Sequence, residues 1–289
     1  MTINQNVINR NIKKVLLHVL CIAFVLICML PIWLLLVNAT RSTGEIQTSV
    51  SFLPGNQLSE NLKMLNQILS DGDISLWLAF FNSAIVSFSV VIFAVGFSAL
   101  FAFVFTVYDF KLNKPISAFV LFIIMVPSQL GIIGFYKLMV QINLIDTFVP
   151  LIMPSIVSAS IVFFITQYYR IALPMEIIEA ARIDGSKELG IFFRMAIPIG
   201  IPALATMGIA AFIESWNAYN LPNIILYTQE IKTLPLIIAS IRTMSMGKEY
   251  MSYGSLYLSI ILSILPVVVI FIMFSKKIVG GVTIGGVKE

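Results

Sequence analysis

The stretch Glu179-Ala180-Ala181-Arg182-Ile183-Asp184-Gly185 lies in a charged loop between two long apolar segments. Met195-Ala196-Ile197-Pro198 follows it after a gap of nine residues. The loop balances its basic and acidic side chains, with Arg170, Arg182, Lys187 and Arg194 against Glu176, Glu179, Asp184 and Glu188. A helix held by anionic lipid carries a basic excess instead. The balanced charge therefore favours a protein partner outside the membrane, and an interfacial helix resting on the headgroups is the alternative.

The composition indicates that the segments around this loop cross a membrane. Of the 289 residues, 59% are apolar and 11% are charged, and the mean hydropathy is +0.98. Such values exclude a soluble globular protein. A helix needs about 20 apolar residues to cross a bilayer. Six blocks are long enough, at residues 15–37, 78–107, 116–139, 148–168, 195–218 and 253–274. The sequence thus predicts an all-α integral membrane protein with six transmembrane helices, the third and fourth interrupted by Pro127 and Pro154.

The distribution of Lys and Arg predicts the orientation, because cytoplasmic loops of membrane proteins carry the excess of these residues. If both termini are cytoplasmic, 12 of the 18 Lys and Arg residues lie inside. The charged loop, residues 170–198, then connects spans four and five on the cytoplasmic side. No basic patch is interleaved with exposed aromatic residues, so nothing indicates a nucleic-acid partner.

We expect one transmembrane domain over residues 1–289, with a core at 78–274, the charged loop at 170–198 and a cytoplasmic tail at 275–289. Outside the membrane, residues 58–69 place Leu58, Leu62, Leu65 and Leu69 on one face of an amphipathic helix. Residues 221–252 contain Pro222, Pro235 and Gly247, and we expect a re-entrant or loop structure there rather than another span.

Within the charged loop, local signals predict two helices joined by a tight corner. Pro174 suits the first turn of a helix, and residues 175–183 all tolerate one. Gly185 is suited to the left-handed conformation that ends a helix. Ser186 is a candidate cap for a second helix over 187–195, which would enter the membrane at an angle.

The loop resembles the cytoplasmic signature of permease subunits from bacterial ABC importers, which reads Glu-Ala-Ala, three residues, Gly, nine residues, Ile-x-Leu-Pro. This chain has Met195 for the Ile and Ile197 for the Leu. The resemblance covers nearly the whole chain and points to the carbohydrate-type permeases, in particular the six-span subunit similar to the G subunit of maltose transporters. Further matching stretches are Pro127-Ser128-Gln129, Ala172-Leu173-Pro174, Pro202-Ala203-Leu204, Ser215-Trp216-Asn217, Thr233-Leu234-Pro235 and the tail 280–288.

The resemblance implies that residues 170–198 form a coupling loop, the short helix of which docks in a cleft of a cytoplasmic ATP-binding subunit. The residues that it assigns to this ATPase coupling are Glu179, Ala180, Ala181, Asp184 and Gly185. It also implies a heterodimer with a second homologous permease, two ATP-binding subunits and an extracytoplasmic sugar-binding protein, in a prokaryotic cell membrane. We expect no cofactor in this chain, with ATP and Mg held by the partner subunits. The sequence contains no Gly-x-x-x-x-Gly-Lys-Ser/Thr phosphate loop, so the chain itself is not expected to be an enzyme.

Polar residues inside the membrane are candidates for the substrate path, because burying them in lipid is costly. The candidates are Asn82, Gln129, Glu214, Trp216, Asn217 and Tyr219. Amides would bond to sugar hydroxyls, and the two aromatic rings offer flat faces for a pyranose. Interfacial anchoring explains the aromatic residues equally well, and hydrogen bonding between helices explains Asn217.

Three other functions compete with a carbohydrate importer. An ABC permease for a non-sugar solute is the nearest alternative. A secondary transporter driven by an ion gradient would show charges deep in the spans and repeat symmetry, and neither is evident. An intramembrane enzyme would need a catalytic set, but His18 is the one histidine and has no suitable companions. The identity and chain length of the sugar stay open.

Overall fold

The computed structural model describes residues 2–246 and 252–286, and these residues form helices joined by turns, with no strand among them. Five segments are long and apolar enough to cross a membrane: Lys13–Asn38, Leu76–Val107, Val149–Ala172, Glu188–Trp216 and Tyr253–Met273. A bent pair of helices supplies a sixth if it counts as one span. The predicted all-α membrane fold is confirmed, and each predicted span corresponds to one of these segments.

The predicted third span is not a straight helix. Its two parts, α5 (Asn113–Met125) and α6 (Ile132–Gln141), belong to a pair bent by 78°. Pro127 causes the break, because the residue before a proline is excluded from the helical region. Val126 accordingly has a ψ of 120°, and α5 ends there.

The chain divides into two compact units, one of residues Met1–Asp73 and Ile238–Leu262 and the other of Ile74–Ile237 and Ser263–Glu289. The helices α13 (Leu234–Met246) and α14 (Tyr253–Gly286) each pass from one unit to the other along the chain. The expectation of a single domain stays a prediction. The predicted tail, residues 275–289, is helical to Gly286 as the end of α14, and 287–289 lie outside the described residues.

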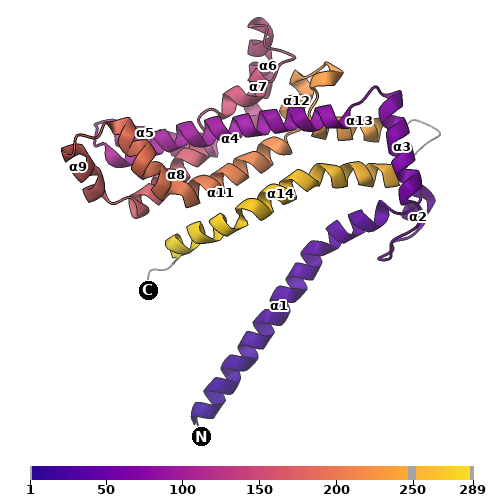
Figure 1. Ribbon diagram of the computed structural model, residues 1–289, viewed down its shortest axis with the longest axis horizontal. Helices are drawn as coiled ribbons and strands as arrows, with labels where there is room; N and C mark the ends of the chain where they lie inside the picture. Colours follow the sequence, from indigo (N-terminus) through magenta and orange to yellow (C-terminus); the bar gives the residue numbers. More distant parts are fainter. Residues whose placement is uncertain (1, 247–251, 287–289) are drawn as a thin grey trace. The chain divides into compact units, whose positions relative to one another are not determined.

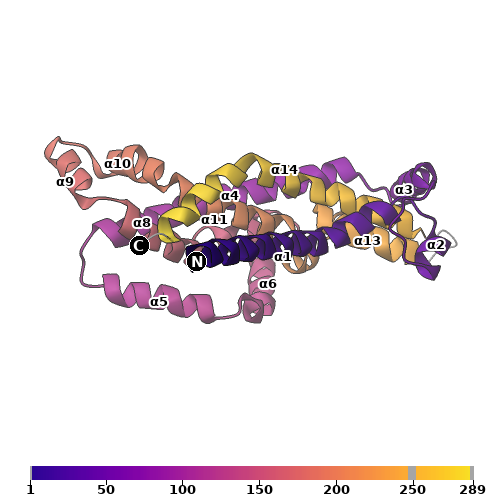
Figure 2. The same cartoon turned by 90° about the horizontal axis from the view of Figure 1, so that it is seen from below.

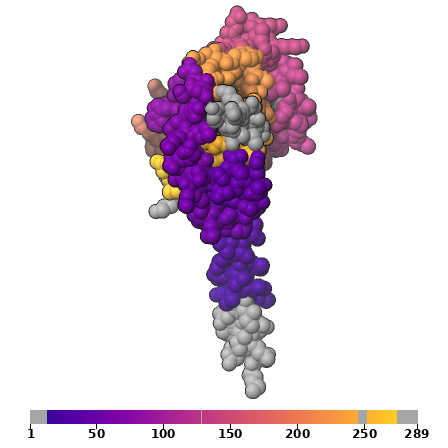
Figure 3. Space-filling model, turned by 90° about the vertical axis from the view of Figure 1, so that its right-hand side faces the viewer, coloured from indigo at the N-terminus to yellow at the C-terminus, as the bar shows by residue number. Residues whose placement is uncertain are grey.

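In the first unit, α1 (Thr2–Asn38) is followed by α2 (Thr43–Thr48) and α3 (Leu58–Asp71). In Figure 3 the indigo part of α1 stands apart from α2 and α3 of the same unit. Ser42 and Glu45 form a capping box that starts α2. Hydrogen bonds from Ser42 lower the pKa of the exposed Glu45 carboxyl.

The buried face of α3 differs from the predicted one. Asn61, Leu65 and Ile68 are buried, whereas Leu58 and Leu62 are exposed. Hydrogen bonding explains which side of α3 is buried. The Asn61 side-chain amide donates to the carbonyls of Ala39 and Arg41, at 2.9 and 3.0 Å, and these bonds turn this side of α3 towards the end of α1. Leaving the two carbonyls buried without a hydrogen-bond donor would cost more free energy than burying one more leucine side chain would gain.

The second unit is built around α4 (Leu76–Val107), α8 (Ala159–Ala172) and α11 (Ile197–Trp216), which lie side by side in Figures 1 and 2. Small residues on α4 allow this close packing, since Ala94, Ser98, Ala99 and Ala102 are all buried. The Ser98 hydroxyl accepts the Ser158 amide at 3.1 Å and so fixes the start of α8 against α4.

The coupling loop lies at one end of the three-helix group formed by α4, α8 and α11, and the elements α6, α7 (Val149–Ile152) and α12 (Asn220–Ile225) lie away from it. At one end lie α9 (Met175–Ile183) and α10 (Glu188–Ile191), as Figure 2 shows. Away from them, α6 and α7 contact α12. After α12 comes α13, which has 13 residues and is too short to span a membrane. This agrees with the expectation of no further span in 221–252, of which residues 247–251 lie outside the described part.

Candidate functional site

The chain leaves α8 and starts α9 at a proline. Leu173 ends α8 in an extended conformation because it precedes Pro174, which cannot follow a helical residue without a clash. Pro174 itself is the N-cap of α9, with φ −69° and ψ 126°, so it lies one residue before the predicted position in the first turn. The result is a separate helix of 9 residues, α9, that covers the end of the three-helix group.

The predicted corner at Gly185 is confirmed and has the geometry of a Schellman motif. Gly185 has φ +79°, a left-handed conformation that other residues adopt only with strain. Its amide donates to the Arg182 carbonyl at 3.0 Å, and the Ser186 amide donates to the Ala181 carbonyl at 2.9 Å. Ser186 does not cap the second helix as predicted: its backbone amide makes the Schellman bond, and Lys187 occupies the N-cap position.

The second predicted helix of the loop, 187–195, leads into the following span as expected. It starts at Glu188 and passes through a π-helical turn, Phe192–Ala196, into α11, so that Glu188–Trp216 is one continuous segment. Proline supplies a physical reason for the altered turn: Pro198 has no N–H to give to the preceding turn. A single π-turn accommodates such a mismatch within a helix, and it is frequent at functional sites.

The two sides of α9 have different surroundings. Ile178 and Ala181 are buried in the same apolar cluster as Phe103 and Ile191, with Ala181 only 3% exposed. Ala181 therefore packs within this chain. On the other side, Glu179, Ala180, Asp184 and Gly185 are exposed. The Ile183 side chain is 87% exposed, so α9 presents an acidic rim around an apolar side chain.

The loop contains an ion pair that the sequence analysis did not predict. Arg182 on α9 donates from Nε and Nη2 to the two carboxylate oxygens of Glu188, at 2.8 and 3.2 Å. Its guanidinium also lies over the ring of Tyr108, 5.3 Å from the centroid. The two charges are six residues apart and belong to different helices, so helical spacing alone could not have predicted their pairing.

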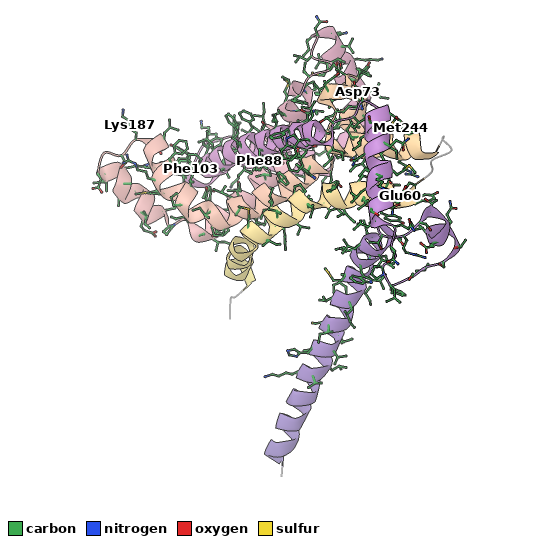
Figure 4. All side chains as sticks on the ribbon, turned by 45° about the vertical axis from the view of Figure 1, so that its right-hand side comes forward. Glu60, Asp73, Phe88, Phe103, Lys187 and Met244 are labelled. Carbon is green, nitrogen blue, oxygen red and sulfur yellow. The ribbon has the colours of Figure 1, made fainter. Side chains whose placement is uncertain are left out.

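The electrostatics of this group follow from its neighbours. The hydrogen bonds to Glu188 raise the pKa of Arg182 above its ordinary value, which keeps the guanidinium charged. Burial raises the pKa of the Tyr108 hydroxyl, and the adjacent Glu188 carboxylate raises it further. Figure 4 shows Lys187 in the turn at one end of the second unit, and Phe103 in the same half of that unit.

Two of the residues proposed for the substrate path are buried and already hydrogen-bonded. Asn82, 6% exposed, donates to the carbonyls of Glu230 and Lys232 at 2.7 and 3.1 Å. Trp216, 2% exposed, donates to the Ser263 carbonyl at 3.0 Å. Its ring is stacked on Phe212 and meets Phe80 edge-on, so in this conformation it offers no free face to a pyranose.

The other four candidates, Gln129, Glu214, Asn217 and Tyr219, are exposed. Asn217 donates its side-chain amide to the Ile213 carbonyl of its own helix at 2.9 Å. Within the described part of the chain, no hydrogen bond joins any two of the six candidates. There, too, no three His, Cys, Asp or Glu side chains are grouped to bind a metal ion.

Comparison with known proteins finds transport permeases that resemble most of this chain. The permease protein AraQ of an arabinooligosaccharide transport system from Halalkalibacterium halodurans is 36% identical over 212 residues, which are 73% of this chain and 74% of that protein. The corresponding AraQ of Bacillus subtilis is 33% identical over 267 residues, 91% of this chain and 92% of that protein. The fold also matches a chain of a bacterial ABC transporter involved in the import of the acidic polysaccharide alginate, with a TM-score of 0.75 at 20% identity. The match covers 92% of this chain and 96% of that chain.

The family match covers most of the chain. Residues 94–282, which include α8 to α12 and the whole coupling loop, match the binding-protein-dependent transport system inner membrane component. Members of this family are transport permease subunits of the prokaryotic plasma membrane, and the membrane-length helices described above fit that location. The chain, with its charged loop between two spans and its Schellman corner at Gly185, therefore belongs to the family of binding-protein-dependent transport system inner membrane components.

Proposed function

We propose that this chain is a permease subunit of an ATP-driven importer, and that α9 is the helix through which the ATPase drives it. Both termini and the coupling loop are cytoplasmic in this proposal, as the distribution of Lys and Arg indicates. The observation that carries it is the outer side of α9, where Ile183 is 87% exposed beside the acidic Glu179. The basic and acidic side chains of the loop are also balanced in number, which supports a protein partner, because a helix held by anionic lipid carries a basic excess.

In this proposal Glu179 pairs with a basic residue of the ATPase, and Ala180 allows the two surfaces to approach closely. Gly185 sets the angle between α9 and the segment that continues as α11. When two ATPase subunits close on ATP, the docked helices move with them. The spans attached to these helices then rearrange, and the transport cavity changes the side to which it opens.

The complete transporter contains a second, homologous permease as the heterodimeric partner, two ATP-binding subunits that hold ATP and Mg, and an extracytoplasmic sugar-binding protein. In the first unit, the apolar side chains of α1 from Val15 to Trp33 are exposed, which supports a further membrane-embedded contact, with lipid or with the second permease. This chain needs no cofactor of its own.

The proposed solute is a carbohydrate, an oligosaccharide or a related glycoside. The support comes from the two arabinooligosaccharide permeases that resemble this chain over most of its length. The alternative is a non-sugar solute carried by the same mechanism, since fold and coupling loop do not depend on the cargo. A carrier driven by an ion gradient would leave the exposed side of α9 without a purpose.

Co-expression with the candidate ATPase and second permease tests the proposal. We expect the complex to be recovered by pull-down and cells to accumulate radiolabelled arabinotriose only with ATP. Glu179→Ala should insert normally but lose both the ATPase and uptake, whereas Glu176→Ala, an exposed acid on the same helix, serves as the matched control. Uptake of arabinotriose without any ATPase would contradict the importer. Uptake of an unrelated solute with ATP would keep the importer and replace the sugar.

A further inference from the structure

Arg182 occupies a junction of three elements in the second unit. Its backbone belongs to α9, its guanidinium is bonded at two points to Glu188 at the start of α10, and the same guanidinium lies over Tyr108, the residue that ends α4. Two-point bonding of guanidinium to carboxylate fixes the relative orientation of the groups as well as their distance.

The junction spans a corner that is otherwise held by the two backbone hydrogen bonds of the Schellman motif and by apolar packing. The connection between α9 and α10 consists of residues 184–187, with Gly185 in the left-handed conformation. In the described chain no side chain caps the first amides of α10. Glycine gives the backbone the most freedom of any residue. The side-chain link adds a directional constraint across this corner, and without it rotation in residues 185–187 would absorb part of a displacement of α9.

Aromatic rings continue from the junction into the membrane-spanning part. The Tyr108 ring meets Phe103 edge-on at 6.3 Å, and Phe103 contacts Phe192 at 5.5 Å between centroids. Phe103 and Phe192 are both buried, and Phe192 is the first residue of the π-helical turn that leads into α11. A close-packed series of rings has little free space, so it transmits a displacement instead of absorbing it.

We propose that Arg182 is a positioning residue for transport: it locks α9 to α10 and α4, so that a displacement of α9 reaches α4 and α11. The inference rests on the proposed function, because it assumes that an ATPase moves α9. The loop thereby has two distinct parts, an outer side of α9 for docking and the group Arg182, Glu188 and Tyr108 for transmission.

The test measures movement at the far end of the second unit in the assembled transporter. A cysteine at the exposed position Asn223 on α12, in a background with Cys21→Ser and Cys28→Ser, reports the accessibility of that end. Its labelling rate with a membrane-impermeant maleimide is measured with and without ATP and vanadate. Allosteric coupling typically corresponds to about a 5- to 150-fold change, so a change of about tenfold is expected for the otherwise unaltered complex.

Arg182→Gln should keep the ATPase bound in a pull-down but reduce the nucleotide-dependent change to less than about twofold, since it removes the two-point link. Lys187→Gln, which removes the same charge from the same loop, should behave like the unaltered complex. The exchange Arg182→Glu with Glu188→Arg restores the pair with its ends reversed, and it should recover more of the response than Arg182→Glu alone.

The outcomes separate the two proposals. If the unaltered complex shows no nucleotide-dependent labelling, the proposed function is contradicted. If the unaltered complex responds and Arg182→Gln responds equally, the positioning role is overturned and the importer stands. Loss of the ATPase from Arg182→Gln would also overturn it, because Arg182 would then be a docking residue. Failure of the exchange variant to exceed Arg182→Glu would show that the link to Glu188 is not the cause.

Discussion

At the scale of single residues, Gly185 is the position whose backbone conformation decides the shape of the coupling loop. Its φ of +79° costs other residues about 1–2 kcal/mol, and open space around it means that strain is the main effect of adding a side chain. We expect Gly185→Ala to lower the melting temperature of the purified chain and to weaken recovery of the ATPase.

Gly190 provides the matched control for this substitution. It lies in α10 with open space around it and a negative φ, so Gly190→Ala should leave stability unchanged or raise it by up to about 1 kcal/mol. Equal effects of the two substitutions would show that the left-handed conformation of Gly185 is not what shapes the loop.

Asn82 is predicted to stabilise the protein without contacting solute. Asn82→Ala leaves the carbonyls of Glu230 and Lys232 without their donor, which should cost about 1–3 kcal/mol. Hydrogen exchange at residues 228–234 should become faster, and the affinity for solute should stay the same. Asn217→Ala, on an exposed side chain that bonds only within its helix, is the control and should change stability by less than about 0.5 kcal/mol. A loss of solute affinity with unchanged hydrogen exchange would show that Asn82 contacts the solute and would contradict the structural role.

At the scale of elements, the packing of α8 against α11 depends on the absence of a side chain at Gly200. A Cβ there would lie 2.8 Å from the Tyr169 ring, which is fully buried, whereas a Cβ at Gly208 would be 3.6 Å from Val91. Gly200→Ala should therefore destabilise the protein by about 1–3 kcal/mol. Gly208→Ala should be tolerated, and thermal unfolding in detergent compares the two. If both substitutions are tolerated, α8 and α11 do not need this close approach.

The loop between α6 and α7 is joined to the segment after α12 through Asp146, and this link should depend on pH. Its carboxylate accepts the amides of Tyr227 and Thr228, at 2.7 and 3.0 Å, and the Thr228 hydroxyl. Partial burial raises the pKa of Asp146, but the three donors outweigh it, so the net pKa is lowered.

The direction in which stability changes with pH follows from this lowered pKa of Asp146. The link contributes stability above the unfolded value of about 3.9 and loses it as the pH falls through the lower folded value. Proteolysis of residues 225–229 should thus increase as the pH falls below the ordinary pKa of about 3.9, and Asp146→Asn should remove that dependence on pH. Asp71→Asn, on another exposed carboxylate, should leave it intact. A persistent increase in Asp146→Asn would assign the effect to another group.

At the scale of the whole molecule, the bent pair α5 and α6 determines the sidedness of the termini. If the pair is one span, six spans place both termini on the same side, whereas a re-entrant pair leaves five spans and opposite sides. We predict that tags at both ends are accessible only from the cytoplasm, in line with the distribution of Lys and Arg. Cysteines placed at Lys187 and Asn223 should be labelled from opposite sides in either case, which controls for vesicle orientation. Opposite sides for the two termini would contradict the six-span arrangement.

The sequence by itself determined the features that depend on short segments. Membrane-length apolar blocks, the break at Pro127 and the left-handed corner at Gly185 follow from the transfer of side chains into lipid and from backbone sterics, which are local properties. Only the tertiary structure decided which side of each helix faces its neighbours. It buried Trp216 between two phenylalanines, turned Ala181 inwards and brought Arg182 to Glu188 and Tyr108. These contacts depend on how helices rotate and pack against one another, and an apolar helix in a membrane shows little difference between its sides along the sequence.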